Sequence, residues 1–338
     1  MREKPLTLYK YFAEAMKYRI IFSILLAAFL SAACQQHRYY VFSGYAQGGV
    51  YSVKADLAGV KTPPKAIQAR IDALLDSIDF SLSGYNKNSL LSRYNRGEEI
   101  FPDRFFTEVR ALSERYRTET GGAFDHASGP LFDIWGFGFT ADSLPAPERV
   151  AAALAACKEE KVLNFNAIAQ GYTCDVVADY LQGLGVVNML VDIGEIYCAG
   201  VNPSGRGWTI AVDNPVDDNQ VPGSDLLDTW QSAGRSCGIV TSGNYRKFYI
   251  RDGKKYAHTI DPRTGCPVTH DLLSATIVAP TAAEADALAT ACMVLGPEPA
   301  RALIEARDDI EGYLICAGDT WMSEGFRAQL ADRDIPQK

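Results

Sequence analysis

Apolar residues recur at helical spacing along much of this chain. Just after Pro63-Pro64 they stand at Ile67, Ile71, Leu74, Leu75 and Ile78. Steps of three and four predict a helix that buries one face. The same spacing predicts further helices over residues 105–120, 147–157, 171–184, 281–296 and 298–307.

Shorter apolar runs between these helices predict strands. They cover residues 41–42, 49–53, 162–165, 186–199 (divided by a turn at Gly194), 208–212, 272–280 and 312–316. Asp252-Gly253 separates two more runs, 247–251 and 254–258, and Asp-Gly in this setting is typical of a β-hairpin. Helices mixed with strands and hairpins predict an α+β fold.

Three stretches show neither the helical spacing nor the short apolar runs described above. Residues 82–97 and 217–232 are polar and predict loops, whereas residues 129–139 are rich in glycine and aromatic side chains. The aromatic loop has two interpretations: a buried aromatic corner, or the wall of a pocket for a flat ring.

The first 33 residues have the pattern of a signal peptide. A basic leader precedes the apolar run 20–30, and Ser31-Ala32-Ala33 leads to Cys34. The run is short for a membrane span. A cysteine directly after small residues resembles a bacterial lipoprotein cleavage site. We therefore expect a signal peptide over 1–33, a lipid on Cys34, and a mature domain over 34–338 on the periplasmic side of the inner membrane. The alternative is plain secretion with an incidental Cys34.

Composition narrows the range of partners. The net charge is −8 and the isoelectric point is about 5.1, which argues against binding to nucleic acid. The chain has eight cysteines, without a C-x-x-C pair or a cysteine–histidine spacing typical of zinc. Seven remain beyond Cys34, and several stand in apolar surroundings as small buried hydrophobes.

Asp286 and Thr290 offer two hard oxygens from one helix face. They stand four residues apart in a helix whose other residues are mostly apolar. An aspartate buried in such a helix must be paired or bind a metal, because an isolated buried charge is too costly. Carboxylate and hydroxyl oxygens suit Mg²⁺. The alternative is a structural cap or salt bridge.

His258 is the candidate for acid–base chemistry. It follows the predicted hairpin, with Asp261 and Arg263 close behind. Histidine with aspartate can position and deprotonate a hydroxyl, and arginine can hold a phosphate. A lone histidine is also often structural. Thr241-Ser242 precede Gly243 at the end of an apolar strand, where their hydroxyls could reach a phosphate or ribose.

These segments together resemble the ApbE family of FAD:protein FMN transferases. The resemblance runs from about Gly48 to Gly296 and rests on the segments 122–125, 135–138, 168–172, 241–245, 258–267 and 285–290. The chain departs from the family pattern at Gln47-Gly48-Gly49, where Met-Gly-Thr is usual. It also departs at Gln170, where lysine or glutamate is usual, and at Glu195, which stands in a glycine turn.

The resemblance implies a T-fold-like arrangement of mixed sheets with packed helices. It also implies an activity: FMN passes from FAD to a Thr or Ser hydroxyl of a target flavoprotein and AMP leaves. Asp286, Thr290 and a backbone carbonyl at Asn166 or Ala167 would hold Mg²⁺. His258 would orient or deprotonate the hydroxyl with support from Asp261. The flavin and its phosphates would be held by Tyr85, Ala123, Phe124, Asp125, Trp135, Gln170, Thr241 and Ser242.

By the same resemblance, the acceptor is a subunit of a membrane redox complex of the Rnf or Nqr type. Two other functions remain open: an FAD pyrophosphatase that yields FMN and AMP, and an exported lipoprotein that binds FAD without chemistry. A pure carrier needs neither a metal face nor a base. A flavin oxidoreductase is disfavoured because the chain has no nicotinamide-binding motif.

Overall fold

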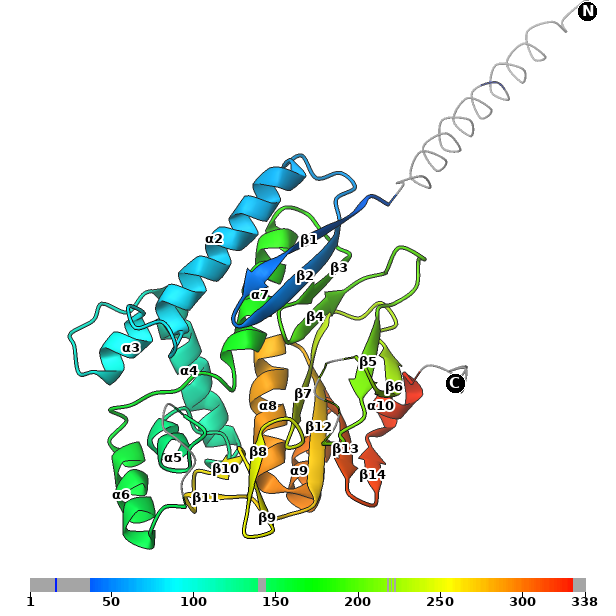
Figure 1. The fold of residues 1–338 in the computed structure, drawn as a ribbon. Helices are drawn as coiled ribbons and strands as arrows, with labels where there is room; N and C mark the ends of the chain where they lie inside the picture. The colour runs from blue at the N-terminus through cyan, green and yellow to red at the C-terminus, as the bar shows by residue number, and fades with distance from the viewer. Residues whose placement is uncertain are drawn as a thin grey trace, which may run out of the picture. The chain divides into compact units, whose positions relative to one another are not determined.

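A large antiparallel sheet forms the centre of the fold in the computed structural model (Figure 1). The structure describes residues 37–138, 144–217, 219, 221 and 223–330, together with Met16. Cys34 and the leader sequence predicted over 1–33, Met16 apart, lie outside these residues. Contacts separate Met1–Arg38 from Tyr39–Lys338, and all elements below belong to the second unit.

The eight strands of the sheet pair antiparallel with every neighbour. In spatial order they are β1 (Tyr39–Ala46), β2 (Gly49–Asp56), β3 (Met189–Asp192), β4 (Ile196–Ala199), β7 (Cys237–Gly243), β12 (Leu272–Ala279), β13 (Glu311–Cys316) and β14 (Thr320–Met322). Three two-stranded sheets accompany it: β5 (Thr209–Asp213) with β6 (Leu226–Gln231), β8 (Phe248–Arg251) with β9 (Lys254–Ala257), and β10 (Ile260–Asp261) with β11 (Cys266–Pro267).

The described residues of this unit form nine helices. They are α2 (Pro64–Leu82), α3 (Leu90–Asn95), α4 (Arg104–Glu119), α5 (Gly129–Ile134), α6 (Pro147–Lys158), α7 (Ala169–Gly183), α8 (Ala282–Leu295), α9 (Pro297–Glu305) and α10 (Glu324–Ala328). This combination confirms the predicted α+β class. Among the described residues no helix is both long and apolar enough to cross a membrane.

Period-two alternation gives the sheet two buried faces. Val240, Ile277 and Leu314 pack in the cluster that contains residues of α8 and α9. Their neighbours along the strands pack on the other face, against β5, β6 and α10. The sheet is therefore covered on both faces at β7, β12 and β13, and α8 lies directly on β7 and β12 (Figure 1).

The start of α8 is fixed by two separate caps. The Thr281 hydroxyl accepts a hydrogen bond from the Glu284 backbone N–H at 3.2 Å, which caps the first turn of the helix. The Asp175 carboxylate on α7 accepts from the N–H groups of Ala282 and Ala283, both at 2.8 Å. These bonds hold the helix that carries Asp286 against α7.

Several predicted elements need correction. Residues 162–165 form no strand, and Asn164 instead donates its N–H to the His126 carbonyl at 2.7 Å. The polar stretch 217–232 contains β6, residues 82–97 contain α3, and the aromatic loop 129–139 begins with α5. The predicted Asp-Gly hairpin is present as β8 and β9, with Asp252 and Gly253 both at positive φ. The seven described cysteines are free thiols.

Candidate active site

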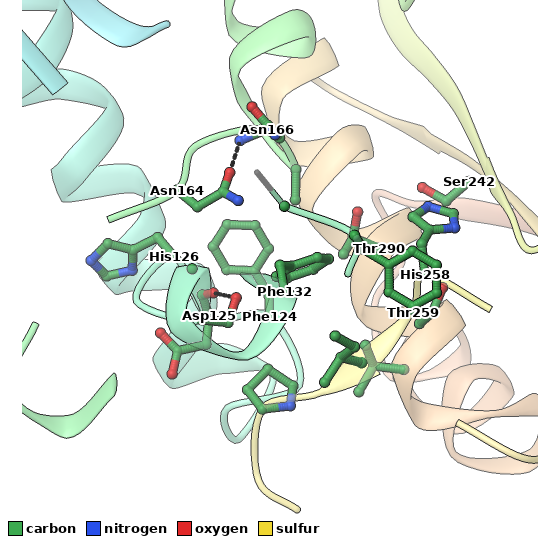
Figure 2. A pocket seen from close by; sticks show the side chains of 18 of the residues that line it. Phe124, Asp125, His126, Phe132, Asn164, Asn166, Ser242, His258, Thr259 and Thr290 are labelled. Atoms are coloured by element: carbon green, nitrogen blue, oxygen red, sulfur yellow. Dashed lines mark hydrogen bonds between the residues drawn. The ribbon is translucent and has the colours of Figure 1, made fainter. Parts of the chain in front are cut away.

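A pocket of about 440 Å³ brings together most of the residues that the sequence singled out. Its lining includes Tyr85, Ala123, Phe124, Asp125, Asn166, Thr241, Ser242, His258, Asp286 and Thr290. Figure 2 shows Phe124 and Phe132 on one side, with His258, Ser242 and Thr290 on the other. Gln170 and Asp261 do not line it.

Asp286 is the most deeply placed acid of the pocket. Its side chain comes from the buried helix α8, and the residue is 4 % exposed. The Gly171 backbone N–H donates to Oδ2 at 3.1 Å. Burial raises the pKa of Asp286 to about 7, opposed by the Gly171 bond and helped by Asp175. Thr290, one turn further along α8, is half-buried at the pocket surface.

Glu195 adds a second carboxylate that sequence reasoning placed only in a turn. It lines the pocket, and its pKa is raised well above the usual range by burial and by the neighbouring Asp286 and Asp192. Asp286 thus disfavours the charged form of Glu195, and a divalent cation between the two carboxylates would remove this repulsion. Asp286, Glu195 and the Thr290 hydroxyl therefore fit a hard cation such as Mg²⁺.

Asn166 and Ala167 also line the pocket. The Asn166 N–H donates to the Asn164 side chain at 2.9 Å, the bond drawn in Figure 2. This bond involves only the N–H group of Asn166. The backbone carbonyl of Asn166 is a separate group and a possible oxygen ligand. Gln170 lies nearby against the turn at Gly194, where an added Cβ would stand 2.5 Å from its Nε2.

His258 follows β9 directly and lines the pocket. Its Nδ1 is 3.0 Å from the Lys247 carbonyl oxygen. A carbonyl only accepts, so Nδ1 carries the proton and Nε2 of the neutral ring keeps a free lone pair. Burial lowers the pKa of His258 to about 4, so the ring is neutral at pH 7. The ring can therefore accept a proton.

Asp261 does not support His258 in the way the sequence suggested. Both of its carboxylate oxygens accept from the Arg263 guanidinium at 2.9 Å. The Lys247 carbonyl orients the histidine instead. Arg263 is also absent from the pocket lining, whereas Lys247 lines it and donates to the Phe137 carbonyl at 3.1 Å. Lys247 is thus a cation of the pocket lining, beside Arg246, and only the folded hairpin reveals it.

The aromatic wall differs in one residue from the prediction. Trp135 donates its indole N–H to the Gly265 carbonyl at 2.8 Å and stacks on Tyr256, so it braces the wall from behind. Phe132 and Phe137 line the pocket in its place, together with Phe124. Tyr85 lies at the rim with 69 % of its surface exposed. The hydroxyls of Thr241 and Thr276 are hydrogen-bonded at 2.8 Å.

Comparison with known proteins agrees with this geometry. The sequence profile of the ApbE family matches residues 48–314. The FAD:protein FMN transferase of Klebsiella pneumoniae (strain 342) is 34 % identical over 297 residues, which covers 79 % of this chain and 82 % of that protein. The FAD:protein FMN transferase of Vibrio cholerae is 34 % identical over 305 residues, with 83 % and 89 % covered.

Solved structures show the same fold. The flavin transferase ApbE from Vibrio cholerae superposes with a TM-score of 0.75 at 31 % identity, over 87 % of this chain and 99 % of that one. The apo flavinyl transferase ApbE of Pseudomonas stutzeri gives 0.76 at 31 % identity, over 87 % and 97 %. The fold and the pocket define an enzyme of the flavin transferase class. The chain belongs to the ApbE family.

Proposed function

We propose that this protein transfers FMN from FAD to a Thr or Ser hydroxyl of a target flavoprotein with release of AMP, and that Mg²⁺ assists the reaction. The observation that carries the proposal is the meeting of three features in one pocket. These are the acid pair Asp286 and Glu195, the neutral His258 and the aromatic wall around Phe124. A module that only bound FAD would need the wall alone.

Each group has a distinct role in this proposal. The wall of Phe124, Phe132 and Phe137 would hold the flavin rings, and Lys247 would face the phosphates. His258 Nε2 would take the proton of the incoming hydroxyl while Lys247 keeps the ring oriented. Asp286, Thr290 and the carbonyl of Asn166 or Ala167 would hold Mg²⁺, with Glu195 as a further carboxylate beside them. When bound, Mg²⁺ supplies charge neutralisation for pyrophosphate oxygens.

A labelling assay tests this function. Purified protein, FAD, Mg²⁺ and a flavoprotein acceptor subunit are expected to yield a fluorescent acceptor band that survives a denaturing gel. Asp286→Ala should abolish the band, whereas Asp308→Ala, which changes an exposed aspartate, should leave it unchanged. Transfer at the parental rate by Asp286→Ala would show that the metal assignment is wrong. Release of FMN and AMP without a labelled acceptor would favour FAD hydrolysis.

We further propose that the protein is a lipoprotein anchored through Cys34 on the periplasmic side of the inner membrane. The leader pattern and the cysteine after Ala33 support this proposal. The acceptor would be a subunit of an Rnf- or Nqr-type redox complex. Cys34→Ser should release the protein from the membrane fraction and stop its labelling with radioactive palmitate. Retention of both properties would exclude an anchor at Cys34.

A further inference from the structure

A histidine and two glutamates meet beside the pocket wall, apart from Asp286. Glu114 lies on α4, His126 follows Asp125, and Glu160 follows α6. One ligand atom of each lies within 4.8 Å of the others. His126 Nε2 and Glu114 Oε1 are 3.3 Å apart. The cluster therefore joins three segments that are distant along the chain.

His126 is the unusual member of this cluster. Its side chain is fully buried, and within the described part of the chain neither ring nitrogen has a hydrogen-bond partner. Buried polar groups are rarely left in this state. The ring stacks on Phe165 at 6.2 Å, and in Figure 2 it points away from Phe132. His126 therefore belongs to the pocket wall, but its imidazole points away from Phe132, and Nε2 lies 3.3 Å from the Glu114 carboxylate.

The surrounding charges leave room for a cation. Glu160 pairs with Arg117 at 2.5 Å and with Arg110 at 3.7 Å, and Arg117 also lies 3.5 Å from Asp125. Three carboxylates therefore face two guanidinium groups, a net charge of about −1. Burial and Arg117 lower the pKa of His126 while Glu114, Asp125 and Glu160 raise it, and the net direction is downward. The neutral ring is the form that binds metals.

We propose that Glu114, His126 and Glu160 bind a first-row transition metal ion, with Zn²⁺ as the best match, at a second site behind the pocket wall that His126 helps to form. Zinc accepts both imidazole nitrogen and carboxylate oxygen as ligands, and the fourth position would be left to water. Two ligands at 2.0–2.1 Å from a tetrahedral ion stand about 3.4 Å apart, close to the Nε2–Oε1 spacing here. To bind the ion, the Glu160 carboxylate would turn away from Arg117. Arg117 would then remain paired with Asp125.

The ion would tie α4 and the end of α6 to the turn that carries Phe124 and Asp125 in the pocket wall. Zinc was not expected from the cysteine–histidine spacing, and this cluster contains no cysteine. Its members are brought together only by folding.

Metal binding by untagged, chelator-treated protein tests the site. Excess Mg²⁺ is added first to occupy the hard oxygen ligands, and Zn²⁺ or Co²⁺ is then titrated by calorimetry and by visible absorption. We expect one tightly bound ion per chain, the intense absorption of four-coordinate Co²⁺, and a higher unfolding temperature with Zn²⁺. His126→Gln and Glu114→Gln should each weaken binding by about a hundredfold or more.

Two controls separate this site from other ligands. Glu119→Gln alters an acid of the same helix, and His270→Gln alters a histidine that contacts the Met293 carbonyl elsewhere. Both should bind Co²⁺ like the parent. Glu114 is partly exposed, so Glu114→Gln should fold even if His126→Gln does not. The proposal fails if the parent binds no Co²⁺ in excess Mg²⁺, or if Glu114→Gln binds it with parental affinity.

Discussion

His258 is oriented by a backbone carbonyl, and this decides which of its nitrogens can act. Nδ1 must donate to the Lys247 oxygen, so the lone pair resides on Nε2. A carboxylate partner would raise the pKa of the ring, whereas the neutral carbonyl leaves burial dominant and the pKa at about 4. The ring therefore stays unprotonated across the physiological range.

We expect His258→Gln to slow FMN transfer about 10²- to 10⁴-fold, the usual contribution of a general base. Glutamine can still donate to Lys247, so FAD affinity should change little. At saturating Mg²⁺, the parent should keep the activity that depends on the neutral His258 ring down to about pH 4. That activity should be lost as the pH falls below this value, because the ring is then protonated. Initial labelling rates and flavin fluorescence titrations measure both effects. A loss of activity centred near pH 6.5 would contradict the assigned pKa.

Close backbone contacts place α8 on its neighbours. A Cβ on Gly238 of β7 would lie 2.3 Å from Ala282 Cα, and one on Gly171 of α7 would lie 2.2 Å from the Ala282 carbonyl oxygen. Backbone atoms cannot turn away as a side chain can. Both glycines are therefore required for α8 to come near enough to present Asp286.

Gly238→Ala should destabilise the protein by about 1–3 kcal/mol, because the added methyl group must push α8 away from the sheet. The displaced helix should also bind Mg²⁺ more weakly. Thermal unfolding and Mg²⁺ titration of FMN transfer measure the two effects. Gly183→Ala is the matched control, since a Cβ there meets no atom within 4 Å and alanine favours the helix. Equal stability of both variants would contradict this account of α8.

Elements with strong local signals could be predicted from the sequence. Thr281 and Gly296 bound α8 as expected, and Asp252-Gly253 forms the hairpin turn. Short elements could not be predicted, because their formation depends on tertiary partners. For example, β6 forms by pairing with β5. The site shows the same division. Asp286 stood out as an acid among apolar residues, whereas Glu195 and Lys247 reach the pocket through folding alone.

Across the whole molecule, buried acids gather around the α7–α8 contact. Burial raises the pKa of Asp175 and of Asp286 to about 7, and that of Glu195 is raised as well. Each folded pKa lies above the unfolded value near 4. The stabilising contribution of Asp175 and Asp286 is therefore complete below pH 4 and is lost as the pH rises through about 7. Bound Mg²⁺ opposes this loss at Asp286 because it favours the charged carboxylate.

The stability gained from Mg²⁺ should therefore increase with pH. Between pH 6 and pH 8 the metal-free protein should lose about 1 kcal/mol for each acid that ionises, or a few degrees in unfolding temperature. Adding Mg²⁺ should raise that temperature more at pH 8 than at pH 6, because less protonated Asp286 competes with the metal. Calorimetry with chelator or Mg²⁺ at both pH values measures the difference. Asp286→Asn keeps an acceptor for the Gly171 N–H but carries no charge. The unfolding temperature of this variant should therefore change little with Mg²⁺ at either pH. A response of equal size in parent and variant would place the cation elsewhere.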